Sequence, residues 1–143
     1  DVTQGADSVL HTAHELAQAF NDPLAVVYVT PEDTYESRRR DITQRDREAE
    51  YPISRAEDEA ADEVEAVVDA AFEGVGGPSV DVVPIGRVGG PVSSVLEEAR
   101  ERDARYLVIG GRKRTPTGKA LFGSVTQSIL LNAERPVVTV MPG

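Results

Sequence analysis

Apolar residues follow two spacings along the chain, one typical of amphipathic helices and one typical of buried strands. In "QGADSVLHTAHELAQAF" they recur every three or four residues and predict a helix over 4–20. The next apolar run, "LAVVYV" (24–29), is short and continuous, which predicts a strand covered on both faces. The same reasoning predicts helices over 54–72, from Pro91 to about Ala99 and over 124–133, and strands over 79–85, 106–110 and 136–141.

This alternation, with short connections, predicts an α/β fold with an open parallel sheet and helices on both faces. The length of 143 residues suits a single domain over 1–143. Such a domain normally opens with a strand, but this sequence opens with a helix. We therefore expect a segment of about five apolar residues upstream, with residues 1–3 as its C-terminal end.

The segment 31–53 is highly charged and has few apolar anchors, so we expect a mobile loop there, with a loop that contains one frayed helical turn as the alternative. Ser54 and Glu57 have the spacing of a capping box at the start of the second helix. Pro91 suits the first position of the third helix, where the missing N–H group costs nothing.

The composition narrows the possible partners. The chain carries 25 acidic and 15 basic side chains, a formal net charge of −10, which argues against nucleic-acid binding. Thirteen arginines and only two lysines on an acidic chain favour a halophilic source, with a high-GC genome as the alternative explanation. The lack of cysteine and of a long apolar run predicts no disulfide and no membrane span, and we expect a cytoplasmic protein.

Positive charge gathers in one segment, "GGRKRTPTGKALFGSV" (110–125), which holds both lysines of the chain. It joins a predicted strand to a predicted helix, and ligands of open parallel sheets bind beyond the carboxyl ends of the strands. Glycines let the backbone approach a ligand, and the first turn of a helix presents N–H groups to a phosphate. These features together predict an anion site. The P-loop pattern does not match, because positions 113 and 120 are Lys and Ala.

The loop also has a recognisable spacing. A strand ends at Gly110, and Gly123-Ser124 completes the pattern Gly-x2-Gly-x9-Gly-Ser, with Lys113 in place of the second glycine. With the helix start at Gly89 to Pro91 and the final "RPVVTV", residues 88–140 resemble the universal stress protein family, in versions seen in haloarchaea.

The resemblance implies a five-stranded, Rossmann-like parallel sheet that binds ATP where the strand order reverses. Its central first strand ends in an aspartate, matched here by Asp1, followed by a Ser or Thr, matched by Thr3. The aspartate and the backbone of Val29 would hold the adenosine end, and the loop, the Gly-Ser pair and the Val125 amide would hold the phosphates. The site so implied comprises Asp1, Thr3, Val29, Gly110, Gly111, Arg112, Lys113, Gly123, Ser124 and Val125.

Three functions remain open at this point. The first is a regulatory module of the stress response that binds ATP, ADP or AMP, with or without Mg²⁺, and is read by an unknown protein partner. Lys113 favours the second, a dimeric interaction protein that has lost ATP binding. The third is a weak nucleotide phosphohydrolase or an adenylyl or phosphoryl transferase, although no general base stands out and no catalytic residue is assigned.

The family often dimerises through its last strand. Prolines bracket that strand here, which fits a sheet edge, so we predict a homodimer through Pro136 to Met141.

Three polar clusters are interpreted as ordinary surface. His11 and His14 lie three residues apart, but no third metal ligand is evident, and solvated side chains are favoured. "SRRRD" at 37–41 is expected to form surface salt bridges. A solvated acidic helix face is expected for Glu97, Glu98, Glu101 and Asp103.

Overall fold

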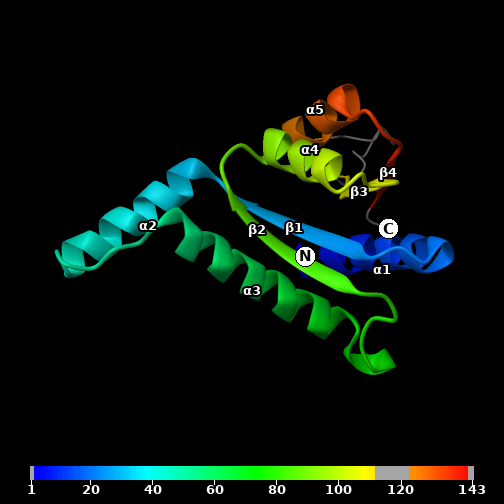
Figure 1. Ribbon diagram of the computed structural model, residues 1–143, viewed down its shortest axis with the longest axis horizontal. Helices are drawn as coiled ribbons and strands as arrows, with labels where there is room; N and C mark the ends of the chain where they lie inside the picture. Colours follow the sequence, from blue (N-terminus) through cyan, green and yellow to red (C-terminus); the bar gives the residue numbers. More distant parts are fainter. Residues whose placement is uncertain (1, 112–122, 142–143) are drawn as a thin grey trace, which may run out of the picture.

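The computed structural model describes residues 2–111 and 123–141 and has an α/β fold (Figure 1). The helices are α1 (Val2–Phe20), α2 (Glu32–Arg45), α3 (Ile53–Ala71), the 3-10 turn η1 (Glu73–Val75), α4 (Pro91–Glu101) and α5 (Ser124–Asn132). The strands are β1 (Leu24–Thr30), β2 (Val82–Val88), β3 (Leu107–Gly110) and β4 (Val137–Val140). Most predicted helices and strands are present, with ends that differ by a few residues. Two segments differ: α2 occupies most of 31–53, and Val2 and Thr3, predicted as the end of a strand, are the first residues of α1 because the helical spacing of the following residues extends back to them.

The described strands form two parallel pairs. β1 pairs with β2, from Leu24 opposite Val82 to Thr30 opposite Val88. β3 pairs with β4, from Leu107 opposite Val137 to Gly110 opposite Val140. The parallel direction is as predicted, but among the described residues no hydrogen-bonded ladder joins the two pairs.

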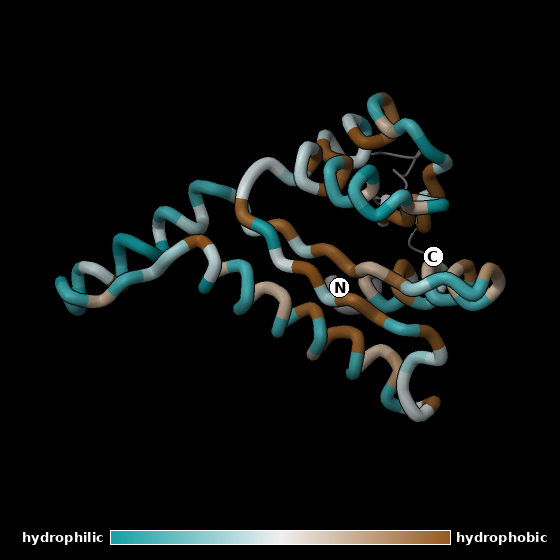
Figure 2. The backbone as a smooth tube through the Cα atoms, viewed as in Figure 1, coloured by the Kyte–Doolittle hydropathy of each residue, from teal (hydrophilic) through white to brown (hydrophobic). Residues whose placement is uncertain are grey.

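Helices cover both faces of these pairs, as predicted. α1 and α3 contact each other and the strands on one face, whereas α4 contacts β1 and α5 on the other (Figure 1). Hydrophobic residues follow the strands and the inner sides of the helices (Figure 2). The largest buried cluster joins α1 to α3 and contains Leu10, Val64, Val68 and Phe72.

The segment 31–53 is where the sequence-based prediction was wrong. Most of it forms α2, a helix with Tyr35 as its one buried residue. The Tyr35 ring stacks on Tyr51 with ring centroids 5.6 Å apart, and its hydroxyl donates to the Tyr51 carbonyl at 2.6 Å. Because α2 projects from the body of the protein (Figure 1), it needs no apolar stripe, and the pattern of a buried helix is missing from its sequence. The expected surface pairing occurs on it, between Arg39 and Glu36 at 2.8 Å.

The start of α3 also differs from the prediction. Pro52 occupies the N-cap position, and no side chain caps the helix. Glu57, expected in a capping box, instead accepts a hydrogen bond from the Val88 N–H at 3.3 Å. The carboxylate therefore ties α3 to the end of β2, a contact between residues distant in sequence.

Candidate functional site

The first half of the candidate site is the turn that follows β1 and β2. The Gly89 N–H donates to the Thr30 carbonyl at 3.0 Å, which brings the end of β1 against the turn after β2. Gly89 has a φ of +144°, a conformation that residues with a side chain rarely adopt. Gly90 is the N-cap residue of α4. The helix α4 therefore begins at the carboxyl ends of β1 and β2, close to Val29.

The second half is formed by the end of β3 and the start of α5. The Thr126 hydroxyl donates to the Gly110 carbonyl at 3.2 Å and ties the first turn of α5 to this strand end. Gly123 is the N-cap residue of α5, and no side chain bonds to its free amides from the cap position. Ser124 and Val125 begin the helix and are exposed, so their backbone N–H groups are the kind that bind an anion.

The glycine pair at the end of β3 has packing reasons of its own. A methyl group on Gly110 would lie 3.3 Å from Val9 Cγ2 of α1. One on Gly111 would overlap the Met141 sulfur, just after β4, while the Gly111 N–H donates to the Val140 carbonyl at 2.9 Å. A side chain at Gly110 would therefore require a small shift of Val9, and one at Gly111 would displace the flexible end of Met141.

The ten predicted site residues fall into three groups. Asp1, Arg112 and Lys113 lie outside the described residues, and Thr3 is in α1 with its side chain undescribed. Val29 is part of the first half of the site. The second half contains Gly110, Gly111, Gly123, Ser124 and Val125. Their role in binding stays a prediction.

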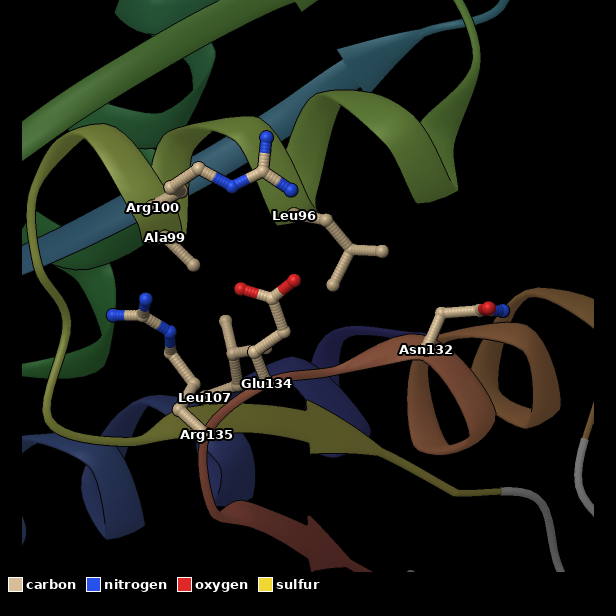
Figure 3. Close-up of a pocket in the computed structure, with 7 residues that line it drawn as sticks. All are labelled: Leu96, Ala99, Arg100, Leu107, Asn132, Glu134 and Arg135. Atoms are coloured by element: carbon tan, nitrogen blue, oxygen red, sulfur yellow. The ribbon is translucent and has the colours of Figure 1, made fainter.

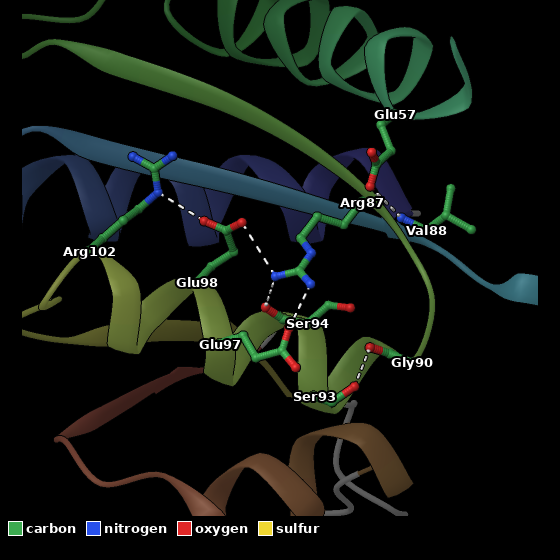
Figure 4. Close-up of polar contacts among 9 residues, drawn as sticks. All are labelled: Glu57, Arg87, Val88, Gly90, Ser93, Ser94, Glu97, Glu98 and Arg102. Atoms are coloured by element: carbon green, nitrogen blue, oxygen red, sulfur yellow. Dashed lines mark hydrogen bonds and ion pairs between the residues drawn. The ribbon is translucent and has the colours of Figure 1, made fainter. Parts of the chain in front are cut away.

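Arg87 is a feature of this region that the sequence analysis missed (Figure 4). From the end of β2 its guanidinium binds Glu97 at 2.6 Å and Glu98 at 3.4 Å, and donates to the Ser94 carbonyl at 3.2 Å. The hydrogen bond to Glu97 raises the pKa of Arg87 above its ordinary value. The prediction of a solvated acidic face on α4 is therefore wrong for Glu98, which is only 14% exposed, whereas Glu97 is exposed as predicted although it pairs with Arg87. Both glutamates connect the helix to β2. A charged residue inside an apolar strand, followed by acids on the next helix, was the available signal.

Glu98 carries a second ion pair in the same cluster. Its other carboxylate oxygen accepts from Arg102 at 3.0 Å, and its side chain is only 14% exposed. The cluster holds the middle of α4 against β2, and so fixes the direction of the helix axis.

A small hollow lies at the opposite end of the second strand pair (Figure 3). Its walls come from α4, β3 and the connection between α5 and β4, with Leu96, Leu107 and Arg135 among them. Its volume of about 10 Å³ leaves room for about one water molecule, so it is no binding site for a nucleotide.

The two histidines have a structural role. Both rings contact Phe72 at centroid distances of 4.7 Å, and His14 Nε2 accepts a hydrogen bond from the Ser79 N–H at 3.0 Å. His14, which is half-buried and hydrogen-bonded, is therefore not simply solvated, whereas His11 is exposed as predicted. Within residues 2–111 and 123–141, no group of three or more possible ligands is placed to hold a metal ion.

Over the same residues, no helix has the length and apolar character needed to cross a membrane.

Comparisons with known proteins agree on one family. The family model described as "Universal stress protein family" matches residues 1–141. A universal stress protein of Mycolicibacterium smegmatis is 55% identical over 40 residues, which are 28% of this chain and only 31%, about a third, of that protein's length.

Solved structures of universal stress proteins from Archaeoglobus fulgidus have the same fold. One is 28% identical, with a TM-score of 0.60, and the match covers 94% of this chain and 87% of that chain. Another, in complex with dAMP, is 22% identical, with a TM-score of 0.56 and coverage of 94% and 86%. With the family model matching nearly its whole length, the chain belongs to the universal stress protein family.

Proposed function

We propose that this protein binds an adenine nucleotide at the carboxyl ends of β1 and β3 and acts as a regulatory module in the stress response. The observation that carries the proposal is the Thr126–Gly110 hydrogen bond, which places the start of α5 directly beside the end of β3. An open helix start next to a strand end is a site where phosphate groups bind in α/β proteins. The related A. fulgidus structure with dAMP supports the choice of an adenine nucleotide.

The described residues fit such a ligand. In this proposal the amides of Ser124 and Val125 bind the phosphate groups, and the exposed Ser124 hydroxyl adds a further donor. The backbone of Val29 holds the adenosine end, on the side of the turn built around Gly89. Arg112 and Lys113 supply positive charge, and Asp1 and Thr3 complete the adenosine side. Mg²⁺ would accompany ATP or ADP as a counterion of the phosphates.

Isothermal titration calorimetry with ATP, ADP and AMP in molar KCl tests the proposal, because high salt suits so acidic a chain. We expect saturable heat from at least one nucleotide and a higher melting temperature in its presence. A Thr126→Val variant keeps the side-chain shape but loses the bond to Gly110, and should bind about 3- to 10-fold more weakly. No heat and no thermal protection at millimolar concentrations of all three nucleotides would reject the proposal.

A second candidate function is a dimeric interaction module without a nucleotide. Lys113, in place of the motif glycine, favours it. The outer edge of β4 has no partner strand among the described residues, and Leu131 on α5 is 84% exposed. In either case we propose a cytoplasmic homodimer formed along the strand Pro136 to Met141. Sedimentation equilibrium measures its mass, and a monomer at 100 µM or so would reject this assembly.

A further inference from the structure

The projecting helix α2 contacts the body of the protein through a small cluster of side chains. The helix stands out from the body (Figure 1) and is hydrophilic over most of its length (Figure 2). Its one buried residue is Tyr35. The anchor cluster, as we call it, consists of Tyr35, Tyr51 and Ala56, with Ile42 and Val88 packed against them. Because so few buried contacts hold α2, its position depends on this cluster.

Two hydrogen bonds give the anchor cluster a defined geometry. The Tyr35 hydroxyl donates to the Tyr51 carbonyl at 2.6 Å, in a buried position. The Tyr51 hydroxyl in turn donates to the Glu59 carboxylate of α3 at 2.8 Å. Separation of Tyr35 from Tyr51 would leave a buried carbonyl without its partner, which is costly. α2 is therefore docked on Tyr51, and Tyr51 is held by α3.

Val88 belongs both to the anchor cluster and to the first half of the candidate site. Its side chain packs against the cluster, and its N–H donates to Glu57 of α3 at 3.3 Å. The next residue, Gly89, donates its N–H to the Thr30 carbonyl at 3.0 Å and forms the turn after β2. A displacement of Val88 therefore moves the Gly89 donor directly, because the two residues are consecutive.

The start of α2 is connected to the same turn from the other side. Thr30, which is 3% exposed, ends β1 and is followed by Pro31, the N-cap residue of α2. The Tyr35 N–H donates to the Pro31 carbonyl at 3.1 Å. One helical turn thus fixes Tyr35 relative to the Thr30 carbonyl, which is the acceptor for Gly89. The turn is held between two short connections, one through Thr30 and one through Val88, and both lead to Tyr35.

We propose that Tyr35 is a positioning residue for the first half of the candidate site: docked α2 holds the Gly89 turn in the shape that the adenosine end of a nucleotide requires. When α2 leaves the anchor cluster, Val88 loses part of its packing and the turn loosens. Coupling between two sites is reciprocal, so a nucleotide beside Val29 stabilises docked α2, and the projecting helix responds to occupancy of the site. This last step rests on the proposed function, whereas the coupling of α2 to the turn does not.

Hydrogen exchange of the nucleotide-free protein tests the coupling of α2 to the turn. Tyr35→Ala removes the ring, and Tyr35→Phe keeps the ring but loses the bond to the Tyr51 carbonyl. Arg39→Ala is the matched control, because it removes an exposed ion pair from the same helix and leaves the anchor cluster intact. The Leu107 amide, hydrogen-bonded at the second strand pair, reports any global loss of stability.

We expect the Val88 and Gly89 amides to exchange about 2- to 12-fold faster in Tyr35→Phe, as the loss of one hydrogen bond predicts, and faster still in Tyr35→Ala. Leu107 should change less than these two amides, and Arg39→Ala should leave all three at the parent rates. If Tyr35→Ala does not fold, Tyr35→Phe decides the test. Val88 and Gly89 rates that equal those of the parent, or that rise only as much as the Leu107 rate, would overturn the proposal.

Calorimetry with two anions then connects α2 to the nucleotide. ATP reaches both halves of the proposed site, whereas inorganic tripolyphosphate reaches only the half at the start of α5. Tyr35→Ala should bind ATP about ten-fold or more weakly, because the binding-competent turn is less populated, and its affinity for tripolyphosphate should change less than about two-fold. A merely structural role of Tyr35 would lower both affinities alike. In the parent protein, ATP at about 100 times its Kd should slow exchange of the Tyr35 amide about ten-fold or more.

The outcomes separate this inference from the proposed function. Equal ATP affinities of Tyr35→Ala and Arg39→Ala, or equal losses for ATP and tripolyphosphate, would overturn the positioning role and leave the proposed function standing. A parent protein that binds neither anion would reject the proposed function. The exchange rates of Val88 and Gly89 in the nucleotide-free variants would then decide the coupling by themselves.

Discussion

The contact between β2 and α3 yields a sharp prediction for the Gly86→Ala variant. A methyl group at Gly86 would lie 2.7 Å from Ala60 Cβ and 2.8 Å from the Ala61 backbone nitrogen, and would overlap the Glu57 carbonyl oxygen. Carbon atoms in favourable contact are about 3.5–4.0 Å apart, so α3 must retreat by roughly 1 Å. Two of these three neighbours are backbone atoms, which no rotamer change can move.

The expected size of the effect follows from opposing terms. Overpacking a well-packed contact costs about 1–3 kcal/mol. Replacing glycine by alanine also restricts the unfolded chain and returns about 0.4–1 kcal/mol. We expect the free energy of unfolding of Gly86→Ala to fall by about 1–2 kcal/mol. For a chain of this length that lowers the melting temperature by about 3–7 °C.

Thermal unfolding followed by circular dichroism measures this change, with Gly74→Ala as the matched control. No atom lies within 4 Å of a methyl group at Gly74, and its φ is not positive, so that variant should melt at or slightly above the parent temperature. The retreat of α3 should also weaken the Glu57–Val88 hydrogen bond, so the Val88 amide should exchange faster in Gly86→Ala. Equal melting temperatures of the two variants would refute the proposed close approach.

Three other predictions concern the stability of the fold. Glu98→Gln weakens the bonds to Arg87 and Arg102, and urea unfolding should show a loss of about 1–3 kcal/mol; a loss indistinguishable from zero would mean that the cluster is only a surface feature. Burial and, next, the hydrogen bond to a neighbouring carboxylate raise the pKa of Tyr51. As the pH rises, Tyr51 therefore loses its proton first in the unfolded chain, and the free energy of unfolding should fall above about pH 10. Urea unfolding at a series of pH values should show a smaller fall in the Tyr51→Phe variant. The same pH dependence in the variant and the parent protein would contradict this role of Tyr51. Phe72→Ala empties a site only 2% exposed and should cost about 3–5 kcal/mol in denaturant unfolding, and a cost below about 1 kcal/mol would show that the cluster closes over the gap.

Local patterns in the sequence are sufficient for much of the fold. The stripe of apolar residues in α1, the continuous apolar run of β1 and Pro91 at the start of α4 each reflect short-range physics, and the structure has these elements where they were predicted. The alternation of helices and strands likewise predicts parallel pairing, because short crossovers permit little else. Membership of the universal stress protein family also follows from the spacing around Gly110 and Gly123, and the family match confirms it.

The α2 segment could not be predicted in this way. A helix that projects from the body of the protein is stabilised by one buried anchor, Tyr35, and by exposed pairs such as Arg39–Glu36. Neither leaves the periodic apolar pattern on which a sequence-based prediction depends.

The sequence by itself determined which segments are helices and strands, because hydrophobic periodicity and local turn chemistry act over a few residues. Only the tertiary structure decided which groups of different elements meet: Glu57 on Val88, Arg87 on the acids of α4, and Met141 against Gly111. Such contacts depend on how whole elements pack, and a pair such as Glu57 and Val88, 31 positions apart, leaves no common periodic signal in the chain.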